Sequence, residues 1–180
     1  ESGHPGIARG VAVAGGFPPW RVVDSLHRSS LRERCRFEAI EALYSLANTC
    51  AADLESIRMS QEHRIGFIAR SPLANGFLAR RPVSIRDLWY SERHRANTPH
   101  SAGEAMLATL AKIADARGVS SAQVALAWVL HNPQVNCALV EPESSAALGE
   151  MIQATHLALS GDEMEELYKT SSHQCADLIQ

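Results

Sequence analysis

Two charged side chains, Glu41 and Arg70, are of the types that carry acid–base chemistry on a small molecule. A carboxylate beside a guanidinium would act as a general base, and the guanidinium would hold the oxyanion that forms as the proton leaves. Tyr44, close to Glu41 in the sequence, is a third catalytic candidate. This set would suit isomerisation, dehydration or cyclisation of a carbonyl compound. The alternative is that Glu41 and Arg70 form a purely structural ion pair.

Four other residues are candidates for binding a substrate: Ser71, Trp89, Tyr90 and Glu143. Trp89 and Tyr90 lie in the long segment 78–100, which also carries several arginines. Segments of this length between regular elements are uncommon unless they form lids or binding loops. The segment is therefore either a solvated basic loop or a lid that offers cations and aromatic rings to an anionic or planar ligand.

The elements that must position these residues alternate between short apolar runs and helical patterns. The runs at 10–14, 65–69 and 135–140 are typical of buried strands. Helical patterns follow Pro18 and Pro19 and recur at 50–63, 102–118, 121–132, 146–156 and 161–168. Residues 37–44 are ambiguous, because their apolar spacing also suits a helix. Strands that alternate with helices imply crossover connections, and hence a parallel sheet.

Helix boundaries are marked most clearly in the second half of the chain. Ser and Glu or Gln occur at the spacing of a capping box, in the pairs Ser101 and Glu104, Ser120 and Gln123, and Ser160 and Glu163. Gly118 is placed to end the helix that starts near residue 102.

Composition is that of one globular domain, which we expect to span residues 1–180. Hydrophobic residues make up 46% of the chain, charged residues 21%, and the net charge is −3. That balance gives no reason to expect nucleic acid or a membrane surface as a partner. Four cysteines without zinc-ligand spacing indicate a reducing, cytoplasmic location and no metal site. The chain begins with Glu1 and not Met, which leaves room for removal of upstream residues.

Three longer motifs carry a resemblance to a known family: ALYSLAN at 42–48, SPLANGF at 71–77 and VSSAQVALAW at 119–128. With them, the chain resembles the last four strand–helix units of the aldo-keto reductases, an NADPH-dependent family with an eight-stranded barrel. The resemblance implies a strand at 37–44 and an α/β fold, half of a TIM barrel. The family's catalytic Asp, Tyr, Lys and His belong to the first four units and have no matching segment here.

The resemblance also allows the family's nicotinamide contacts to be checked by position. Gly15 and Gly16 stand where the family has a Ser-Asn pair that binds the carboxamide. Glu41 replaces a Gln that binds the same amide, and Arg70 replaces a Tyr that stacks on the nicotinamide ring. The two glycines would leave the carboxamide unsatisfied, and Arg70 would meet the oxidised ring as a like charge.

The adenosine end of the cofactor is affected in the same way. Glu143 falls at or beside the basic residue that binds the 2′-phosphate of NADP, and Met151 replaces the Asn that contacts the adenine. A carboxylate would repel the phosphate that the family's basic residue attracts. The resemblance therefore predicts a protein that does not bind NADPH in the family's manner, and we expect no cofactor.

Half a barrel would have two open sheet edges and an uncovered apolar face, which a soluble monomer rarely tolerates. We expect a homodimer that completes the barrel, or a complementary half-barrel chain. A rearranged sheet covered by the 78–100 segment and the terminal helix is a third arrangement. Whether an N-terminal half was lost in evolution or removed from this chain stays open.

Three functions are compatible with these features. The favoured hypothesis is a cofactor-independent enzyme or binding protein for a small molecule, derived from an aldo-keto reductase and serving a biosynthetic pathway. The second is a fragment or split subunit of an NADPH-dependent aldo-keto reductase. The third is a noncatalytic pseudoenzyme that acts as a scaffold.

Overall fold

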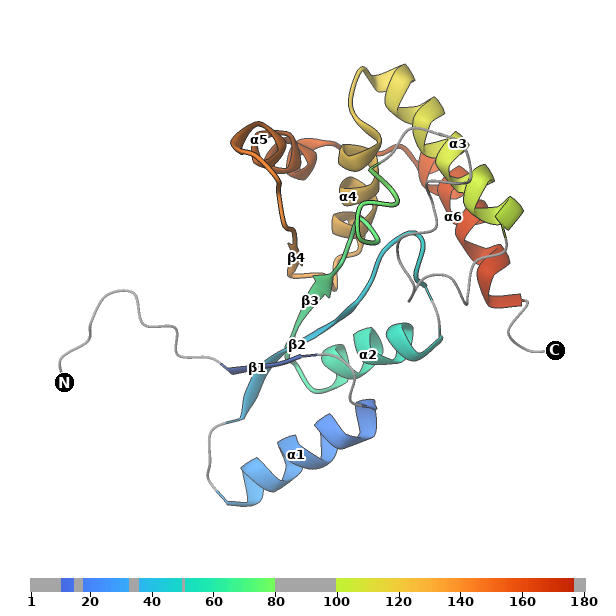
Figure 1. Ribbon diagram of the computed structural model, residues 1–180. Helices are drawn as coiled ribbons and strands as arrows, with labels where there is room; N and C mark the ends of the chain where they lie inside the picture. Colours follow the sequence, from blue (N-terminus) through green and yellow to red (C-terminus); the bar gives the residue numbers. More distant parts are fainter. Residues whose placement is uncertain (1–10, 15–17, 33–35, 50, 80–99, 177–180) are drawn as a thin grey trace.

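The computed structural model describes residues 11–14, 18–32, 36–49, 51–79 and 100–176. Within these ranges the chain folds into four parallel strands and six α-helices (Figure 1). The strands are β1 (Val11–Ala14), β2 (Phe37–Leu43), β3 (Gly66–Arg70) and β4 (Cys137–Leu139). They form one sheet in the order β1-β2-β3-β4, so each strand lies beside the next one in the sequence.

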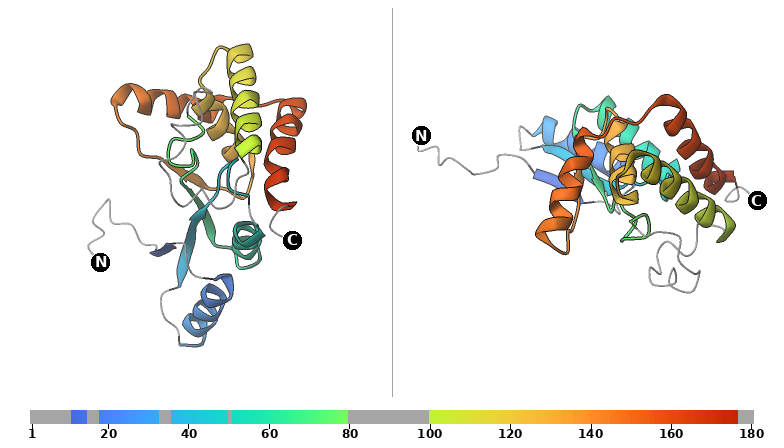
Figure 2. Two further views of the ribbon diagram at one scale, coloured as in Figure 1. Left: turned by 45° about the vertical axis from the view of Figure 1, so that its right-hand side comes forward. Right: turned by 90° about the horizontal axis from the view of Figure 1, so that it is seen from above.

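The helices connect the strands and cover one face of the sheet. They are α1 (Pro19–Leu31), α2 (Ala51–Glu62), α3 (His100–Arg117), α4 (Ser121–His131), α5 (Ser145–Gln153) and α6 (Gly161–Ala176). Helix α2 packs on β2 and β3, α4 contacts β4, and α3 packs against both α4 and α6. The views in Figure 2 agree that α3 and α6 run side by side, while α5 lies at the margin of the molecule. A series of parallel strands with its helices on one side is a partial (β/α) barrel.

The sheet is buried on the helix side and open on the other. Ile40, Ala42, Phe67 and Ala69 are all buried, whereas the residues that alternate with them, Glu41, Leu43, Ile68 and Arg70 among them, are only partly buried. Parallel sheets are normally covered on both faces. We call the second face the open sheet face; in a closed barrel it would be the interior.

The core lies between the sheet and the helices. Helix α4 is its centre, because nearly every residue from Ser121 to Val129 is buried and Trp128 is 1% exposed. One of the three motifs that carry the resemblance, VSSAQVALAW, thus covers most of this buried helix. None of the helices in the described part of the chain is long and apolar enough to cross a membrane.

Several sequence predictions of element boundaries are confirmed. Residues 37–43 form a strand, and Ser120 and Gln123 cap α4 through reciprocal hydrogen bonds. Ser160 and Glu163 do the same at the start of α6. Gly118 follows the last residue of α3 with a φ of 66°, the left-handed conformation that glycine adopts without strain.

One capping prediction is wrong, and two elements differ in length. Helix α3 begins at His100, so Ser101 lies inside the helix and is not its cap. Strand β4 covers only Cys137–Leu139, because pairing with β3 ends where Arg70 meets Leu139. Helix α6 continues to Ala176, well beyond the predicted end at residue 168.

Candidate functional site

The open sheet face carries an ion pair at the carboxyl ends of β2 and β3. The pairing of Glu41 with Ile68 and of Leu43 with Arg70 puts Glu41 and Arg70 on the same face of neighbouring strands. Glu41 Oε1 lies 3.2 Å from Arg70 Nε, with side-chain exposures of 24% and 32%. The sequence suggests Glu41 and Arg70 as a pair, and the structure brings them together on adjacent strands.

The contact is an ion pair without a well-aligned hydrogen bond. Arg70 Nε is inaccessible to solvent and has no hydrogen-bond partner within the described ranges, although Glu41 Oε1 is near it. The distance satisfies an ion pair, but the direction of the N–H does not meet hydrogen-bond geometry, so the attraction is mainly Coulombic. Within the described part of the chain, no hydrogen bond engages the terminal nitrogens of Arg70.

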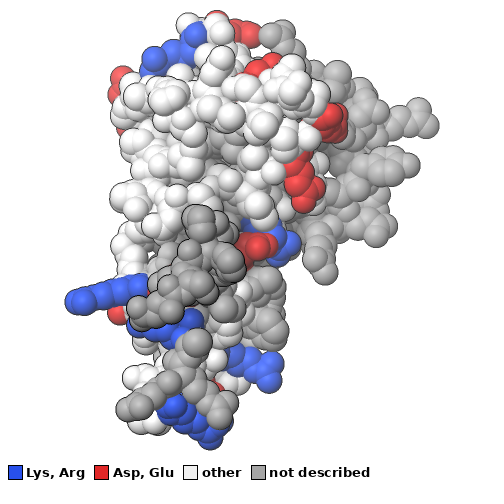
Figure 3. Space-filling model, turned by 90° about the vertical axis from the view of Figure 1, so that its left-hand side faces the viewer, with Lys and Arg blue, Asp and Glu red and all other residues white. Residues whose placement is uncertain are grey.

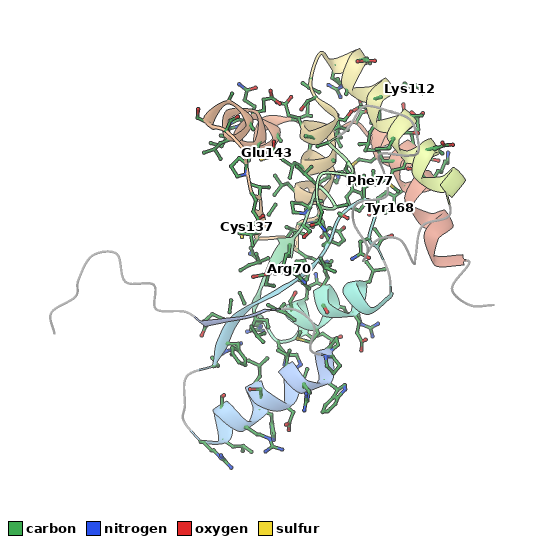
Figure 4. The ribbon with its side chains drawn as sticks, viewed as in Figure 1. Arg70, Phe77, Lys112, Cys137, Glu143 and Tyr168 are labelled. Carbon is green, nitrogen blue, oxygen red and sulfur yellow. The ribbon has the colours of Figure 1, made fainter. Side chains whose placement is uncertain are left out.

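Apolar side chains surround the pair on the open sheet face. Leu43 is the last residue of β2 and pairs with Arg70, and Ile68 lies two residues before Arg70 on the same face of β3. On β4, Cys137 stands opposite Ile68 and Leu139 stands opposite Arg70, and both are exposed. Figure 4 shows Arg70 at the carboxyl end of β3 and Cys137 at the start of the neighbouring strand β4. The pair therefore occupies a polar spot in an otherwise apolar surface, the usual composition of a small-molecule site.

Tyr44, the third catalytic candidate, points away from this pair and into the core. Its ring is 3% exposed and stacks on Trp128 with centroids 5.4 Å apart. Asn132 Nδ2 donates a hydrogen bond of 3.2 Å to the hydroxyl of Tyr44. Burial raises the pKa of Tyr44, the hydrogen bond from Asn132 opposes the rise, and the nearby Tyr168 adds to it. This arrangement holds Tyr44 as a neutral structural group.

Ser71 and Glu143 occupy different positions relative to the pair. Ser71 follows Arg70 directly and adopts a left-handed backbone with φ of 51°. Its carbonyl accepts a hydrogen bond of 2.9 Å from the N–H of Ala74, which starts the turn after β3. Glu143 is exposed between β4 and α5, and Figure 4 places it beyond Cys137 in the direction of α5. Trp89 and Tyr90 lie outside the described residues.

Two asparagines that the sequence hypothesis did not include hold the strand ends in place. Asn132 anchors Tyr44, as described above. Asn136 Oδ1 accepts a hydrogen bond of 2.7 Å from the N–H of Phe67, and the N–H of Asn136 donates to the carbonyl of Phe67 at 2.9 Å. Asn136 therefore extends the ladder between β3 and the start of β4. Both asparagines lie close to Pro133 in the turn between α4 and β4. This proline was the sequence feature that could have pointed to them.

The fit of NADPH to this face can be judged from the residues present. Arg70 is already paired with Glu41, and an exposed carboxylate, Glu143, stands just before α5, whose N-cap is Ser144. A carboxylate donates no hydrogen bond to a phosphate and repels its negative charge. Gly15 and Gly16 lie outside the described residues. The charges of Glu41, Arg70 and Glu143 therefore differ from those of the NADPH contacts that the resemblance implies at these positions. Within the described ranges, no three His, Cys, Asp or Glu side chains are grouped as metal ligands would be.

Comparisons with known proteins agree with this architecture. The family model described as "Aldo/keto reductase family" matches residues 4–171. The chain is 31% identical over 133 residues to an L-glyceraldehyde 3-phosphate reductase of Escherichia coli O157:H7, covering 69% of this chain and 38% of that protein. It is 26% identical over 152 residues to an uncharacterized oxidoreductase, YrpG, of Bacillus subtilis strain 168, covering 79% of this chain and 43% of that protein. The chain thus spans less than half the length of these relatives.

Proposed function

Because the chain belongs to the aldo/keto reductase family, we propose that it is a half-barrel that corresponds to the C-terminal half of such a protein and that it forms one wall of a small-molecule site. The observation that carries this proposal is the Glu41–Arg70 pair on the open sheet face. In barrels of this kind the functional groups gather at the carboxyl ends of the strands, where both residues stand. A second half-barrel must cover the face to complete the site.

The ligand class follows from the groups on this wall. Arg70 offers terminal nitrogens to an anion or to a carbonyl oxygen, and Leu43, Ile68 and Leu139 supply apolar contact. A small carbonyl compound with an anionic group fits this combination. The relatives named for reducing L-glyceraldehyde 3-phosphate suggest a compound of this type as the first probe.

The family usually uses NADPH, but our proposal contains no hydride step. The support for this part is the pairing of Arg70 with Glu41 and the carboxylate of Glu143 near the start of α5. We expect that the chain does not bind NADPH in the family's manner. Saturable NADPH binding at micromolar concentration, followed by tryptophan fluorescence, would instead favour a split subunit of an NADPH-dependent reductase.

A second candidate function is cofactor-independent acid–base chemistry at the same wall. The carboxylate of Glu41 beside the guanidinium of Arg70 has the composition of a general base with an oxyanion-binding partner. Glu41 would remove a proton next to the carbonyl, and Arg70 would hold the enolate oxygen. Isomerisation or dehydration in a biosynthetic pathway would follow from such a step. Ser71, which follows Arg70, stays a candidate of this site, whereas Tyr44 supports the end of β2 from the core side.

Ligand binding and turnover separate these functions. L-glyceraldehyde 3-phosphate should raise the melting temperature of the wild-type protein, and Arg70→Ala should abolish the rise. Glu41→Gln should still bind the ligand under either function. In the acid–base alternative, the wild type should turn the ligand over and Glu41→Gln should not. A matched control is Arg58→Ala, which removes an arginine from the exposed side of α2. A rise that survives Arg70→Ala would contradict the assigned wall, and the absence of any ligand among small carbonyl compounds would favour a scaffold.

A further inference from the structure

The sheet has unpaired edges at both ends. Strand β1 pairs only with β2, and β4 pairs only with β3, within the described part of the chain. An unpaired edge exposes a row of backbone donors and acceptors that another strand can satisfy. Because all four strands are parallel, the free edge of β4 is complementary to the free edge of β1 in a second copy.

Exposed apolar side chains gather on the elements next to these edges. Of the seven large exposed apolar residues in the described ranges, five belong to α1, β4 and α5. They are Trp20, Leu31, Leu139, Leu148 and Ile152. Helix α5 contributes no buried residue at all to the core. Apolar surface that collects in this way marks a contact with another protein surface.

The α1 edge is basic. The described residues 18–32 contain three exposed arginines and one exposed aspartate, and Arg28 pairs with that aspartate over 2.8 Å. The four residues are Arg21, Asp24, Arg28 and Arg32. In Figure 3, lysine and arginine side chains gather toward the lower end of the molecule, where α1 lies. An acidic surface is the complement of this edge.

The opposite edge, formed by β4 and α5, is acidic. Residues 137–157 contain three glutamates and neither lysine nor arginine. These glutamates, Glu141, Glu143 and Glu150, are all exposed. Figure 3 also shows a broad uncharged area above the basic end, on the side of the molecule from which α5 projects. The two edges therefore carry opposite charge around apolar surface.

We propose that the open sheet face is covered by a second copy of this chain, related by a twofold axis that runs along the strands. Strand β4 of each copy would lie beside β1 of the other, and the acidic α5 edge would meet the basic α1 edge twice. Four strands from each copy would make the eight that close a barrel of this type. This inference rests on the proposed function, because the covered face is the wall that carries Arg70.

Charge on the open sheet face permits this arrangement. Glu41 and Arg70 neutralise each other within one chain, so two copies of the face meet without like-charge repulsion. A face with an unpaired carboxylate would place like charges opposite each other across the twofold axis, which is costly in a partly desolvated interior.

The test is the mass in solution of the wild-type protein and of two charge-reversed variants. One variant carries Arg21→Glu and Arg32→Glu at the basic edge, and the other carries Glu143→Arg and Glu150→Arg at the acidic edge. Analytical ultracentrifugation should give about 39 kDa for the wild type, twice the 19.6 kDa of one chain. Each variant alone should associate more weakly by about tenfold or more, because like charges then meet at both edges.

Mixing the two variants gives the sharpest result. One variant then has two acidic edges and the other has two basic edges. The mixture should therefore form a heterodimer in which opposite charges meet at both contacts. A matched control, Glu55→Arg with Glu104→Arg, reverses two exposed glutamates on α2 and α3 and should leave the dimer intact. A monomeric wild type, a dimer indifferent to both reversals, or a mixture that stays monomeric would overturn the second copy as occupant. A monomer that still binds the carbonyl probe through Arg70 would leave the proposed function standing.

Discussion

Glu41 and Arg70 lie 3.2 Å apart on neighbouring parallel strands and are the paired charges of an otherwise apolar sheet face. Both residues stand at positions where the family resemblance implies contacts with nicotinamide. Their opposite charges offset each other on the open sheet face, which we propose is covered by a second copy. The coupling free energy between Glu41 and Arg70 should therefore be measurable.

We expect Glu41→Gln and Arg70→Ala to be coupled in a double-mutant cycle. Both side chains are partly exposed, so the coupling free energy should be about 1 kcal/mol, at the upper end for surface pairs. Urea unfolding of the wild type, the two single variants and the double variant supplies the value. The exposed helical pair Arg58 and Glu62 is the control and should couple more weakly. Additive effects of Glu41 and Arg70 would show that the contact is incidental.

Tyr44→Phe should destabilise the fold by about 1 kcal/mol, because it removes the acceptor of a hydrogen bond from Asn132. Tyr168→Phe is the control, since Tyr168 is exposed and its ring pairs with Trp128 in an edge-type arrangement. Equal losses of unfolding free energy for the two variants would contradict the anchoring role assigned to the Tyr44 hydroxyl.

The ionisation of Tyr44 gives an independent reading of its burial. Because burial raises the pKa of Tyr44 above 10.0, the neutral form is favoured in the folded state. The stability that this provides is fully present below the unfolded pKa and is lost as the pH rises through the folded pKa. The titration of Tyr44 is followed by absorbance at 295 nm, as the difference between the wild type and Tyr44→Phe. This difference should appear at a pH above 10. A normal titration would place Tyr44 in contact with solvent.

The Arg117–Glu163 pair should give α6 an acid-sensitive attachment to α3. Arg117 Nε and Nη2 donate to Glu163 at 2.7 and 2.6 Å, and the Ser160 N–H donates at 2.7 Å. These hydrogen bonds, that from Arg117 foremost, lower the pKa of Glu163 to about 2 from 4.5. A lowered folded pKa means that the contribution is present above pH 4.5 and is lost as the pH falls toward 2.

Urea midpoints of Glu163→Gln and wild type, measured from pH 7 to pH 2, test this attachment. The difference between them should be largest above pH 4.5 and shrink as the pH falls toward 2. Glu104→Gln removes an exposed carboxylate from α3 and controls for the loss of one negative charge. A difference that does not change over this range would mean that the pair does not hold α6.

Asn136→Ala should loosen the junction of β3 and β4. The variant removes the acceptor of the Phe67 N–H and leaves that buried donor unpaired, at a cost of about 1–2 kcal/mol. Hydrogen exchange at the Phe67 amide should quicken more than exchange at the Ala69 amide. Unchanged protection of Phe67 would show that the side-chain acceptor does not contribute.

The sequence predicted most of the fold because its local signals agree with the tertiary structure. The cap at Ser120 and the stop at Gly118 are local, and both are confirmed. Residues 37–43 could not be assigned from propensity, because their strand form depends on pairing with β1 and β3 on both sides. The family resemblance supplied that assignment.

The site was predicted less completely. The alternation of Ile40, Ala42 and Tyr44 with Glu41 and Leu43 already indicates that Tyr44 faces the helices and not the ion pair. The hydrogen-bond partners of Asn132 and Asn136 could not be predicted from the sequence, because these contacts join residues 88 and 69 positions apart. Spacing in one sequence does not identify such long-range hydrogen bonds.

The measurement that tests the central claim most directly is the labelling rate of Cys137 as a function of protein concentration. Cys137 is exposed on β4 and shares the open sheet face with Ile68. A maleimide reagent, followed by mass spectrometry of the peptide that contains Cys137, reports the accessibility of that face. We predict fast labelling in dilute protein and progressive protection as the concentration rises through the range in which the mass doubles. A rate for Cys137 that is equally fast at all concentrations would contradict the account.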